Sequence, residues 1–230
     1  MDNKILEIKN QRYSTFIANF FMCEYCHYVD CNWNRMMVGF KCKVCSKPSD
    51  GAIIYFSSSV TSLLNLIQES YHSKFYISES KEENSFEESA KSHYLSVVIY
   101  FCTLREVLLQ KFLDEMCLLH KIPTLVYERL LADNQMYSQK QNKLFYSMLN
   151  IKWEDAIKEA NTKDDLDYIY LNTLLKKAVD CRNEFLHKGR DYFIDRKLAE
   201  ECIMNLWTLL NLYVRFHNDF VHPYYLSKCT

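Results

Sequence analysis

The chain has 230 residues and a formal net charge of −1; hydrophobic residues make up 49% of it and aromatic residues 15%. This composition excludes an intrinsically disordered chain and predicts one good-sized domain or two small ones. With so little net charge, a polyanionic partner would be bound by a local patch and not by a generally basic surface.

Glycine and proline, the residues that punctuate turns, are scarce, with three of each. Gly39 and Gly51 lie near the N-terminus, and only Gly189 lies beyond them. The long remainder is therefore expected to be mostly helical. No GxGxxG or GxxxxGK pattern occurs, which excludes mechanisms that need a glycine-rich phosphate loop.

The localisation of the protein is predicted from the N-terminus, from the most apolar stretch of the chain and from the cysteine content. The N-terminus is polar from Met1 to Lys4 with no apolar region behind it, so no secretory signal is expected. The stretch from Tyr94 to Leu119 is interrupted by charged residues and does not fit a membrane span. Ten cysteines then indicate a reduced, cytoplasmic protein whose paired cysteines are metal ligands.

Residues 1–60 are predicted to form a small zinc-ribbon-like module with short strands. The strand candidates are Met36–Phe40 and Ala52–Phe56, which are rich in apolar and β-branched side chains. Residues 61–92 are predicted to connect this module to the rest of the chain. They would contain a helix from about Val60 to His72 and a Ser- and Glu-rich linker over residues 77–92.

Residues 93–230 are predicted to form a domain of four or five helices, which makes the chain mainly α. The first helix is expected from about Tyr94 to His120, closed by Pro123. Its apolar side chains surround most of the circumference, which indicates a central core helix or one that also faces a partner subunit. One or two shorter helices are expected between Thr124 and Ala160.

Two long helices complete the predicted domain. One is expected from about Asp164 to Lys188, with Thr162 and Asp165 spaced as a capping box. The other is expected from about Asp195 to Phe220, where apolar residues repeat at helical spacing. Histidines 217 and 222 have no ligand spacing and are expected at the surface or at helix ends.

Two CxxC pairs are the most specific pattern in the chain. Cys23 and Cys26 are separated by fifteen residues from Cys42 and Cys45. Each CxxC turn brings two thiolates within reach of one ion, and two such turns complete a tetrahedral set of four sulfurs that suits Zn²⁺. Since four cysteines leave no position for water, the predicted site is structural, with one zinc per chain. Four buried free cysteines are the alternative.

The cysteine arrangement resembles a zinc ribbon over roughly residues 20–56, with Cys31 and His27 as spare ligands. Such ribbons bind nucleic acid or protein, and the fold alone does not say which. Aromatic and basic side chains in this segment would either stack on single-stranded nucleic acid or form the core of the small module. They are Tyr25, Tyr28, Trp33, Arg35, Lys41 and Lys43.

A second pattern lies near the end of the helix predicted to finish at Lys188. Asn183 and His187 are four residues apart, which places them about 40° apart on one helical face and about 6 Å apart along the axis. The three residues could together cleave RNA. His187 would move the proton of the RNA 2′-hydroxyl or protonate the leaving oxygen, and Arg182 would hold the phosphate. Asn183 would orient the imidazole or a phosphate oxygen. Ordinary capping of a helix C-terminus is the competing interpretation.

The Arg182-Asn183-x-x-x-His187 motif in an all-helical setting resembles the RxxxxH motif of the HEPN superfamily, in which a polar residue, commonly Asn, follows the Arg. The resemblance covers residues 91–230 in architecture and about eight residues in motif. Many members are metal-independent ribonucleases that dimerise so that two motifs face one cleft, in phage defence, toxin–antitoxin or RNA-processing systems, and other members are inactive. Members paired with a nucleotidyltransferase antitoxin often carry Tyr two residues after the His, where this chain has Gly189.

The resemblance implies a HEPN-like helical bundle and a metal-independent endoribonuclease with Arg182, Asn183 and His187 as catalytic residues. Glu106 is a candidate supporting acid, although pairing with a neighbouring cation explains it equally well. The expected partners are RNA, a second copy of the chain in a homodimer, and a regulator or antitoxin protein.

The alternative function is a non-catalytic dimeric adaptor that binds a protein or nucleic acid. An exposed His187 ring facing a cleft near Arg182 would favour the enzyme, and a ring buried against the final helix would favour the adaptor.

Overall fold

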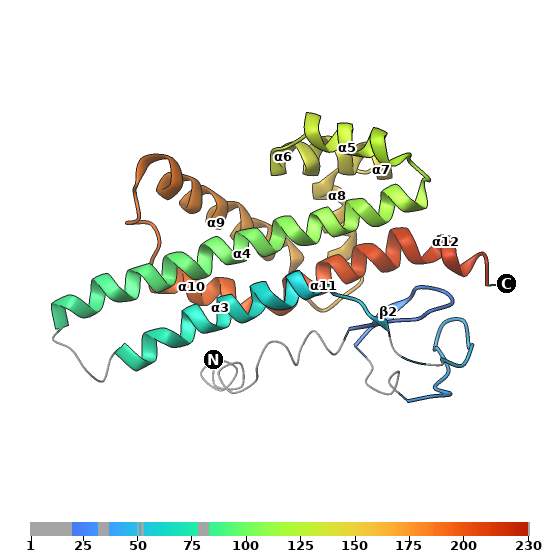
Figure 1. Ribbon diagram of the computed structural model, residues 1–230, viewed down its shortest axis with the longest axis horizontal. Helices are drawn as coiled ribbons and strands as arrows, with labels where there is room; N and C mark the ends of the chain where they lie inside the picture. Colours follow the sequence, from blue (N-terminus) through green and yellow to red (C-terminus); the bar gives the residue numbers. More distant parts are fainter. Residues whose placement is uncertain (1–19, 32–36, 50, 52, 78–82, 230) are drawn as a thin grey trace. The chain divides into compact units, whose positions relative to one another are not determined.

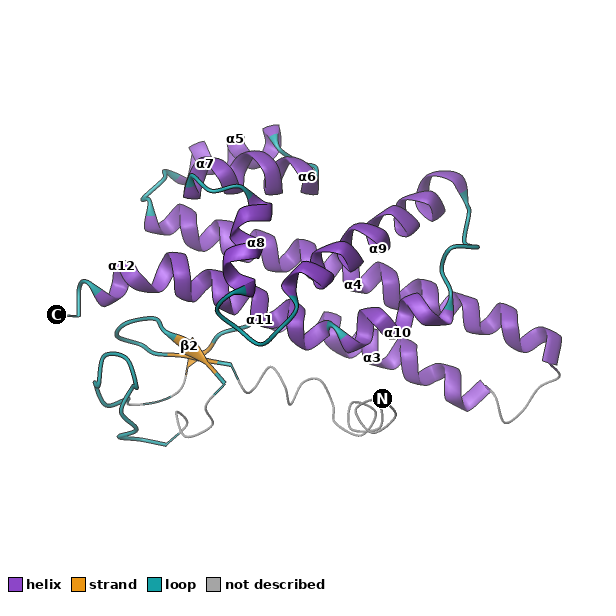
Figure 2. Cartoon of the chain, turned by 180° about the vertical axis from the view of Figure 1, so that it is seen from behind, coloured by secondary structure: helices purple, strands orange, loops and turns teal. Residues whose placement is uncertain are grey.

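The computed structural model describes residues 20–31, 37–49, 51, 53–77 and 83–229. Within these residues the fold is mainly α, as predicted, and the three strands all belong to the N-terminal part of the chain (Figures 1 and 2). None of the described helices combines the length and the apolar character that crossing a bilayer requires. The chain divides into two compact units.

In its described residues, the first unit has helices as its only regular elements. It takes in residues 56–105 and 170–209 of the described chain. Its elements are α3 (Ser58–Ile77), the start of α4 (Glu83–Leu119), most of α9 (Tyr168–Lys188), α10 (Arg196–Met204) and the start of α11 (Leu206–Phe216). Apolar side chains at helical spacing, such as Leu64 and Ile67 of α3, are buried in its core.

The second unit combines a small sheet with helices. It takes in residues 20–55, 106–169 and 210–229 of the described chain. Its strands are β1 (Phe21–Met22), β2 (Val29–Asp30) and β3 (Ile53–Ile54). The sheet order is β2-β1-β3 and both pairs are antiparallel, so that Phe21 lies between Asp30 and Ile54.

Only one of the two predicted strands is present. The Ala52–Phe56 candidate contains β3, and Ala52 itself lies outside the described residues. The Met36–Phe40 candidate is wrong over its described part, since residues 37–40 form a turn in which the Phe40 amide donates to the Met37 carbonyl at 3.1 Å. Gly39 causes the difference, because it adopts a left-handed conformation (φ +82°) that ends an extended segment.

Helix α4 begins at Glu83, earlier than the predicted start at Tyr94 and inside the segment expected to be a linker. It ends at Leu119, as the sequence indicates, because Lys121 turns the chain at φ +53° and Pro123 cannot continue the helix. Among the described side chains of α4, the one large hydrophobic that remains exposed is Leu118. The apolar circumference of this helix is therefore buried within a single chain and does not by itself require a partner subunit.

The stretch between α4 and α9 contains more elements than expected. They are α5 (Thr124–Asp133), α6 (Tyr137–Gln139), the π-helical turn η2 (Lys140–Leu144), α7 (Phe145–Leu149) and α8 (Trp153–Asn161). Aromatic packing fixes these short pieces: the Trp153 ring lies 5.1 Å from Phe145 and 5.4 Å from Phe216, both edge to face. Asn150, at φ +54°, makes the turn between α7 and α8.

The predicted capping box at Thr162 and Asp165 is wrong. Helix α9 begins at Tyr168, and the side chain that caps it is Asn161, whose Oδ1 accepts from the Tyr168 and Ile169 amides at 2.8 and 3.3 Å. Thr162 instead ends α8, and its hydroxyl donates to the Glu159 carbonyl at 2.7 Å.

The last predicted helix begins as expected but is interrupted twice. Asp195 caps α10 by accepting from the Leu198 amide at 2.8 Å. The helix breaks at Asn205, between α10 and α11, and α11 then widens into the π-helical turn η3 (His217–Val221) before α12 (His222–Leu226). A π turn inserts one extra residue and so rotates the side chains that follow it.

Replacing Asn161 by Ala should lower the free energy of unfolding by about 1 kcal/mol, because the two amides that begin α9 lose their acceptor. Chemical denaturation monitored by circular dichroism would measure the loss. Thr162→Ala is the matched control, and its effect should stay within about 0.5 kcal/mol because this side chain is exposed. The opposite ranking would show that Thr162 and not Asn161 caps the helix in solution.

Candidate functional site

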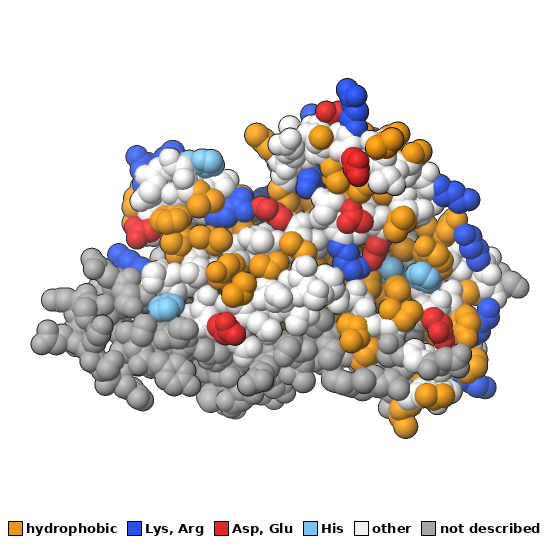
Figure 3. All heavy atoms as spheres, in the orientation of Figure 1, with side chains coloured by type: hydrophobic (Ala, Val, Ile, Leu, Met, Phe, Trp, Pro, Cys, Tyr) orange, Lys and Arg blue, Asp and Glu red, His pale blue; other side chains and the backbone are white. Residues whose placement is uncertain are grey.

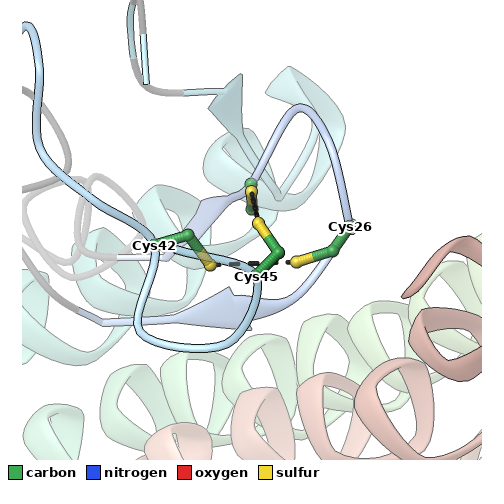
Figure 4. A group of neighbouring side chains, drawn as sticks. Cys26, Cys42 and Cys45 are labelled. Carbon is green, nitrogen blue, oxygen red and sulfur yellow. Dashed lines mark hydrogen bonds between the residues drawn. The ribbon is translucent and has the colours of Figure 1, made fainter. Parts of the chain in front are cut away.

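The four cysteines of the CxxC pairs lie together in the second unit. Their sulfurs are all within 4.8 Å of one another, and Figure 4 shows the labelled thiols of Cys26, Cys42 and Cys45 pointing toward a common centre from two loops. The Cys23–Cys45 and Cys26–Cys42 sulfur pairs are each separated by 3.8 Å. A tetrahedron with metal–sulfur bonds of ~2.3 Å has edges of about 3.8 Å, so the four thiols fit a tetrahedral ion such as zinc.

Each CxxC pair forms the same backbone knuckle. In the first, the His27 amide donates to the Cys23 carbonyl at 2.9 Å, and in the second the Ser46 amide donates to the Cys42 carbonyl at 2.8 Å. The residue after the second cysteine is left-handed in both, with φ +60° at His27 and +58° at Ser46. This reversal brings the second thiol of each pair to the same side as the first.

Burial makes this cluster unfavourable for bare thiolates. Cys23, Cys26 and Cys42 are buried and Cys45 is half-buried. Burial raises the pKa of the Cys26 thiol and that of the Cys45 thiol, so without a cation they keep their protons. A bound metal ion reverses this preference, because it stabilises the deprotonated sulfurs directly.

The two spare candidates do not join the cluster. Among the described residues, the group that could hold a metal consists of the four CxxC cysteines. Cys31 is exposed. The His27 ring stacks on the ring of Tyr225, with centroids 3.6 Å apart and planes 3° apart.

The first knuckle is hydrogen-bonded to η3. The Val29 amide donates to Asn218 Oδ1 at 2.9 Å, and Asn218 Nδ2 donates to the Val29 carbonyl at 2.8 Å. His217 Nε2 lies 2.7 Å from the His27 carbonyl. Farther along the chain, Leu226 and Cys229 pack against the cysteine cluster. The first knuckle and the cysteine cluster are therefore bound to helical residues of the same unit through polar and apolar contacts.

His217 lies at the centre of this attachment. Its Nδ1 is 2.8 Å from Glu115 Oε2, and its Nε2 is 2.7 Å from the His27 carbonyl oxygen. Burial raises the pKa of Glu115, but the hydrogen bond from His217 and the charge of Lys111 outweigh it and hold that pKa below its ordinary value. The Tyr55 hydroxyl donates to the same carboxylate at 3.2 Å.

Histidines 217 and 222 lie at helix ends, which was one of the two expectations, since His217 begins η3 and His222 begins α12, but neither lies at the surface. Both are buried, with exposed fractions of 1% and 8%. The sequence offered one signal that could have identified His217 and Asn218, which is that these polar residues directly follow the apolar run of α11. It offered none for Glu115 or Tyr55, since each looks like an ordinary residue of its element.

The Arg-Asn-x-x-x-His motif occupies the last two turns of α9 in the first unit. Arg182 and Asn183 are in contact: Arg182 Nη2 donates to Asn183 Oδ1 at 3.2 Å. His187 lies one turn further on and is exposed. Within the part of the chain that the structure describes, its ring makes no hydrogen bond or ion pair. Glu106, the candidate supporting acid, is half-buried on α4 and belongs to the second unit.

The end of α9 also shows the capping chemistry that competes with catalysis. Gly189 is left-handed at φ +65°, and its amide donates to the Phe185 carbonyl at 2.8 Å. Glu184 pairs with Lys188 at 2.6 Å and with Arg190 at 3.7 Å. Lys188 and Arg190 therefore have structural partners, whereas His187 takes no part in the cap.

The aromatic and basic residues of the ribbon are largely paired with one another. Lys43 forms an ion pair with Asp30 at 3.3 Å and lies 5.1 Å from the centroid of the Tyr28 ring. The Tyr25 ring is covered by Lys47 at 5.3 Å. Trp33 and Arg35 lie outside the described residues.

Comparison with known proteins identifies no relative: no family model, no curated protein and no solved structure matches the chain. The geometry of the two candidate sites is therefore the basis for assigning a function.

Replacing Asn218 by Ala should lower the free energy of unfolding by about 1–3 kcal/mol, because the amide and the carbonyl of Val29 both lose their partner. Thermal or chemical denaturation would measure the change. Asn142→Ala removes an exposed amide from the other π-helical turn and should change stability by less than about 0.5 kcal/mol. Equal effects of the two variants would mean that the Asn218 bonds do not hold the knuckle.

Proposed function

We propose that this protein is a metal-independent endoribonuclease of HEPN type in which Arg182, Asn183 and His187 cleave RNA. The observation that carries the proposal is the exposed ring of His187, which has no hydrogen bond or ion pair among the described residues and lies one turn from the Arg182–Asn183 contact. A histidine with only a capping or packing role would be expected to bond to the helix end or to be buried. Exposure is one part of the feature that distinguishes the enzyme from an adaptor, the other part being a cleft near Arg182 that the ring faces.

The residues have separate roles in the proposed reaction. His187 transfers a proton at the 2′-hydroxyl or at the leaving oxygen, which a neutral imidazole and an imidazolium can each do near neutral pH. The guanidinium of Arg182 binds the phosphate and stabilises the charge that develops on it. Asn183 holds the Arg182 side chain through its Oδ1, which keeps the guanidinium on the His187 side of the helix.

The role of the cysteine cluster in this proposal is structural. One zinc ion per chain would be held by Cys23, Cys26, Cys42 and Cys45 and would supply folding energy to a module with a small core. The proposed enzyme is cytoplasmic and acts in defence, as a toxin or in RNA processing. It works as a homodimer, which rests on the HEPN resemblance since α4 is already buried in one chain. The ribbon would engage the substrate, a regulator or an antitoxin protein.

His187→Ala should reduce RNA cleavage by about 10²-fold or more, because it removes the proton-transfer group. Arg182→Ala should act similarly, and Asn183→Ala should have a milder effect since an orienting role is easier to replace. The measurement is cleavage of tRNA and mRNA by the purified chain with EDTA present and the fold checked by circular dichroism. DNA of the same sequence lacks the 2′-hydroxyl and should survive.

His120→Ala is the matched control, because His120 is also an exposed histidine near a helix C-terminus: it follows α4 directly, and His187 lies in the last turn of α9. It should cleave RNA at the wild-type rate. Cleavage that persists in both the Arg182 and the His187 variants would contradict the mechanism, and so would cleavage that vanishes in EDTA while the fold is retained. If no RNA is cut, the adaptor function replaces the enzyme.

Elemental analysis of freshly purified protein should find one zinc per chain. Cys42→Ser should lower the zinc content and the thermal stability, because one thiolate of the tetrahedral set is lost. Since η3 and α12 contact the knuckle, this variant should also increase amide hydrogen exchange in residues 217–226, beyond the ribbon itself. Cys31→Ser is the matched control and should keep the metal. A full zinc content in Cys42→Ser would exclude this ligand set.

A further inference from the structure

The turn after α9 displays two aromatic rings beside the proposed catalytic motif. Tyr192 and Phe193 are 61% and 50% exposed, although aromatic side chains of this size usually bury most of their surface. Their ring centroids are 4.2 Å apart and their planes are tilted by 49°. The two rings thus form one exposed aromatic surface, here called the aromatic platform.

The backbone beneath the aromatic platform is fixed against α9. The Arg190 amide bonds to the Glu184 carbonyl at 3.3 Å, and the Cys181 thiol lies 3.8 Å from the Phe193 carbonyl. Ile194, the next residue, is buried with an exposed fraction of 3%. The two rings therefore project from a turn whose backbone is fixed before and after them. A ligand that binds to such a preorganised surface orders it less, so less entropy is lost on binding.

The position of Cys181 relates the platform to the proposed catalytic residues. Cys181 is the immediate neighbour of Arg182 on α9, so the contact with the Phe193 carbonyl places the backbone of the platform next to the motif. His187 lies between this contact and the turn at Gly189. A nucleotide stacked on the platform would therefore lie against the last turns of α9, which carry Arg182 and His187.

The charges around the platform suit a phosphate backbone. Lys188 and Arg190 share the carboxylate of Glu184, and Asp191 lies in the same turn. Over residues 182–193 the three cations Arg182, Lys188 and Arg190 face two carboxylates, so one positive charge is in excess at this end of α9. Both cations stay about half exposed, with side-chain fractions of 52% and 53%. Figure 3 shows Lys, Arg and His side chains gathered with hydrophobic ones over the end of α9.

We propose that Tyr192 and Phe193 bind unpaired bases of single-stranded RNA by stacking, while Lys188 and Arg190 contact the adjoining phosphates. This inference rests on the proposed cleavage function and gives it a substrate class. Base faces are accessible in single strands and hidden in a duplex, so a stacking surface selects unpaired RNA. A second copy of the chain suits the surface less well, because a two-fold contact would set Lys188 and Arg190 against their own copies.

The test measures RNA binding in the full-length His187→Ala protein, in which cleavage does not interfere. Fluorescence anisotropy with a labelled, unstructured RNA should show binding that the same sequence loses when it is paired in a duplex. Tyr192→Leu with Phe193→Leu should weaken binding by about five- to a hundredfold, because stacking is lost while an apolar side chain remains. Tyr192→Phe should bind normally.

Three further variants make the result specific. Tyr146→Leu removes another exposed tyrosine, in α7 of the second unit, and should leave binding unchanged. Lys188→Gln and Arg190→Gln should each reduce the slope of log affinity against log salt by about 1, as expected for phosphate contacts.

The outcomes separate this inference from the cleavage function. If the Tyr192→Leu, Phe193→Leu protein binds single strands as well as its parent, or if duplex RNA binds equally well, the aromatic platform is not the binding surface. If the same two changes convert a dimer into a monomer in sedimentation without altering RNA affinity, the surface is an interface between copies. If the wild-type chain cuts no RNA but binding depends on both rings, the platform stands and the cleavage proposal fails.

Discussion

Four hydrogen-bonding groups of η3 hold the cysteine module to the helices of the second unit. Asn218 bonds to both the amide and the carbonyl of Val29, and His217 connects the His27 carbonyl to Glu115. Val29 and His27 flank the end of the first knuckle, so these bonds fix the backbone that carries Cys26. The position of one pair of thiols therefore depends on residues almost two hundred positions later in the chain.

Burying the Glu115–His217 pair in a folded interior carries a desolvation penalty. Both groups must leave water, and their attraction compensates only where further partners satisfy the remaining donors and acceptors. Here Lys111 and Tyr55 bond to Glu115, and a backbone carbonyl accepts from the far side of His217. A polar network of this kind specifies one arrangement of its members, because any displacement leaves a buried charge without its partner.

The two candidate sites differ in how far their side chains are exposed to solvent. The cysteine cluster is closed: its thiols are buried or half-buried, its knuckles are bonded internally, and its lysines lie on its own tyrosine rings. The end of α9 is open, with His187, Tyr192 and Phe193 exposed beside cations. A closed set of four sulfurs suits a structural ion, whereas an open, partly charged surface suits a ligand from solution.

Local patterns in the sequence determined the features that depend on a few neighbouring residues. The spacing within and between the CxxC pairs predicted the cluster, since the knuckle is a local turn. Asp195 predicted the start of α10 and Pro123 the end of α4, because a cap and a missing amide act within one turn. The alignment of Asn183 and His187 along one face of α9 follows from the helical repeat alone.

Only the tertiary structure decided the features for which the local sequence allows more than one arrangement. Thr162 and Asn161 can both cap a helix, and Asn161 does so because Tyr168, at the start of α9, is buried and bonded to Asp164, which in turn pairs with Arg215. For His217, likewise, no local pattern indicates its partners, because Glu115 and His27 are 102 and 190 residues away along the chain. Such contacts have no local signature, because their energy depends on which distant groups the packed helices bring to the same place.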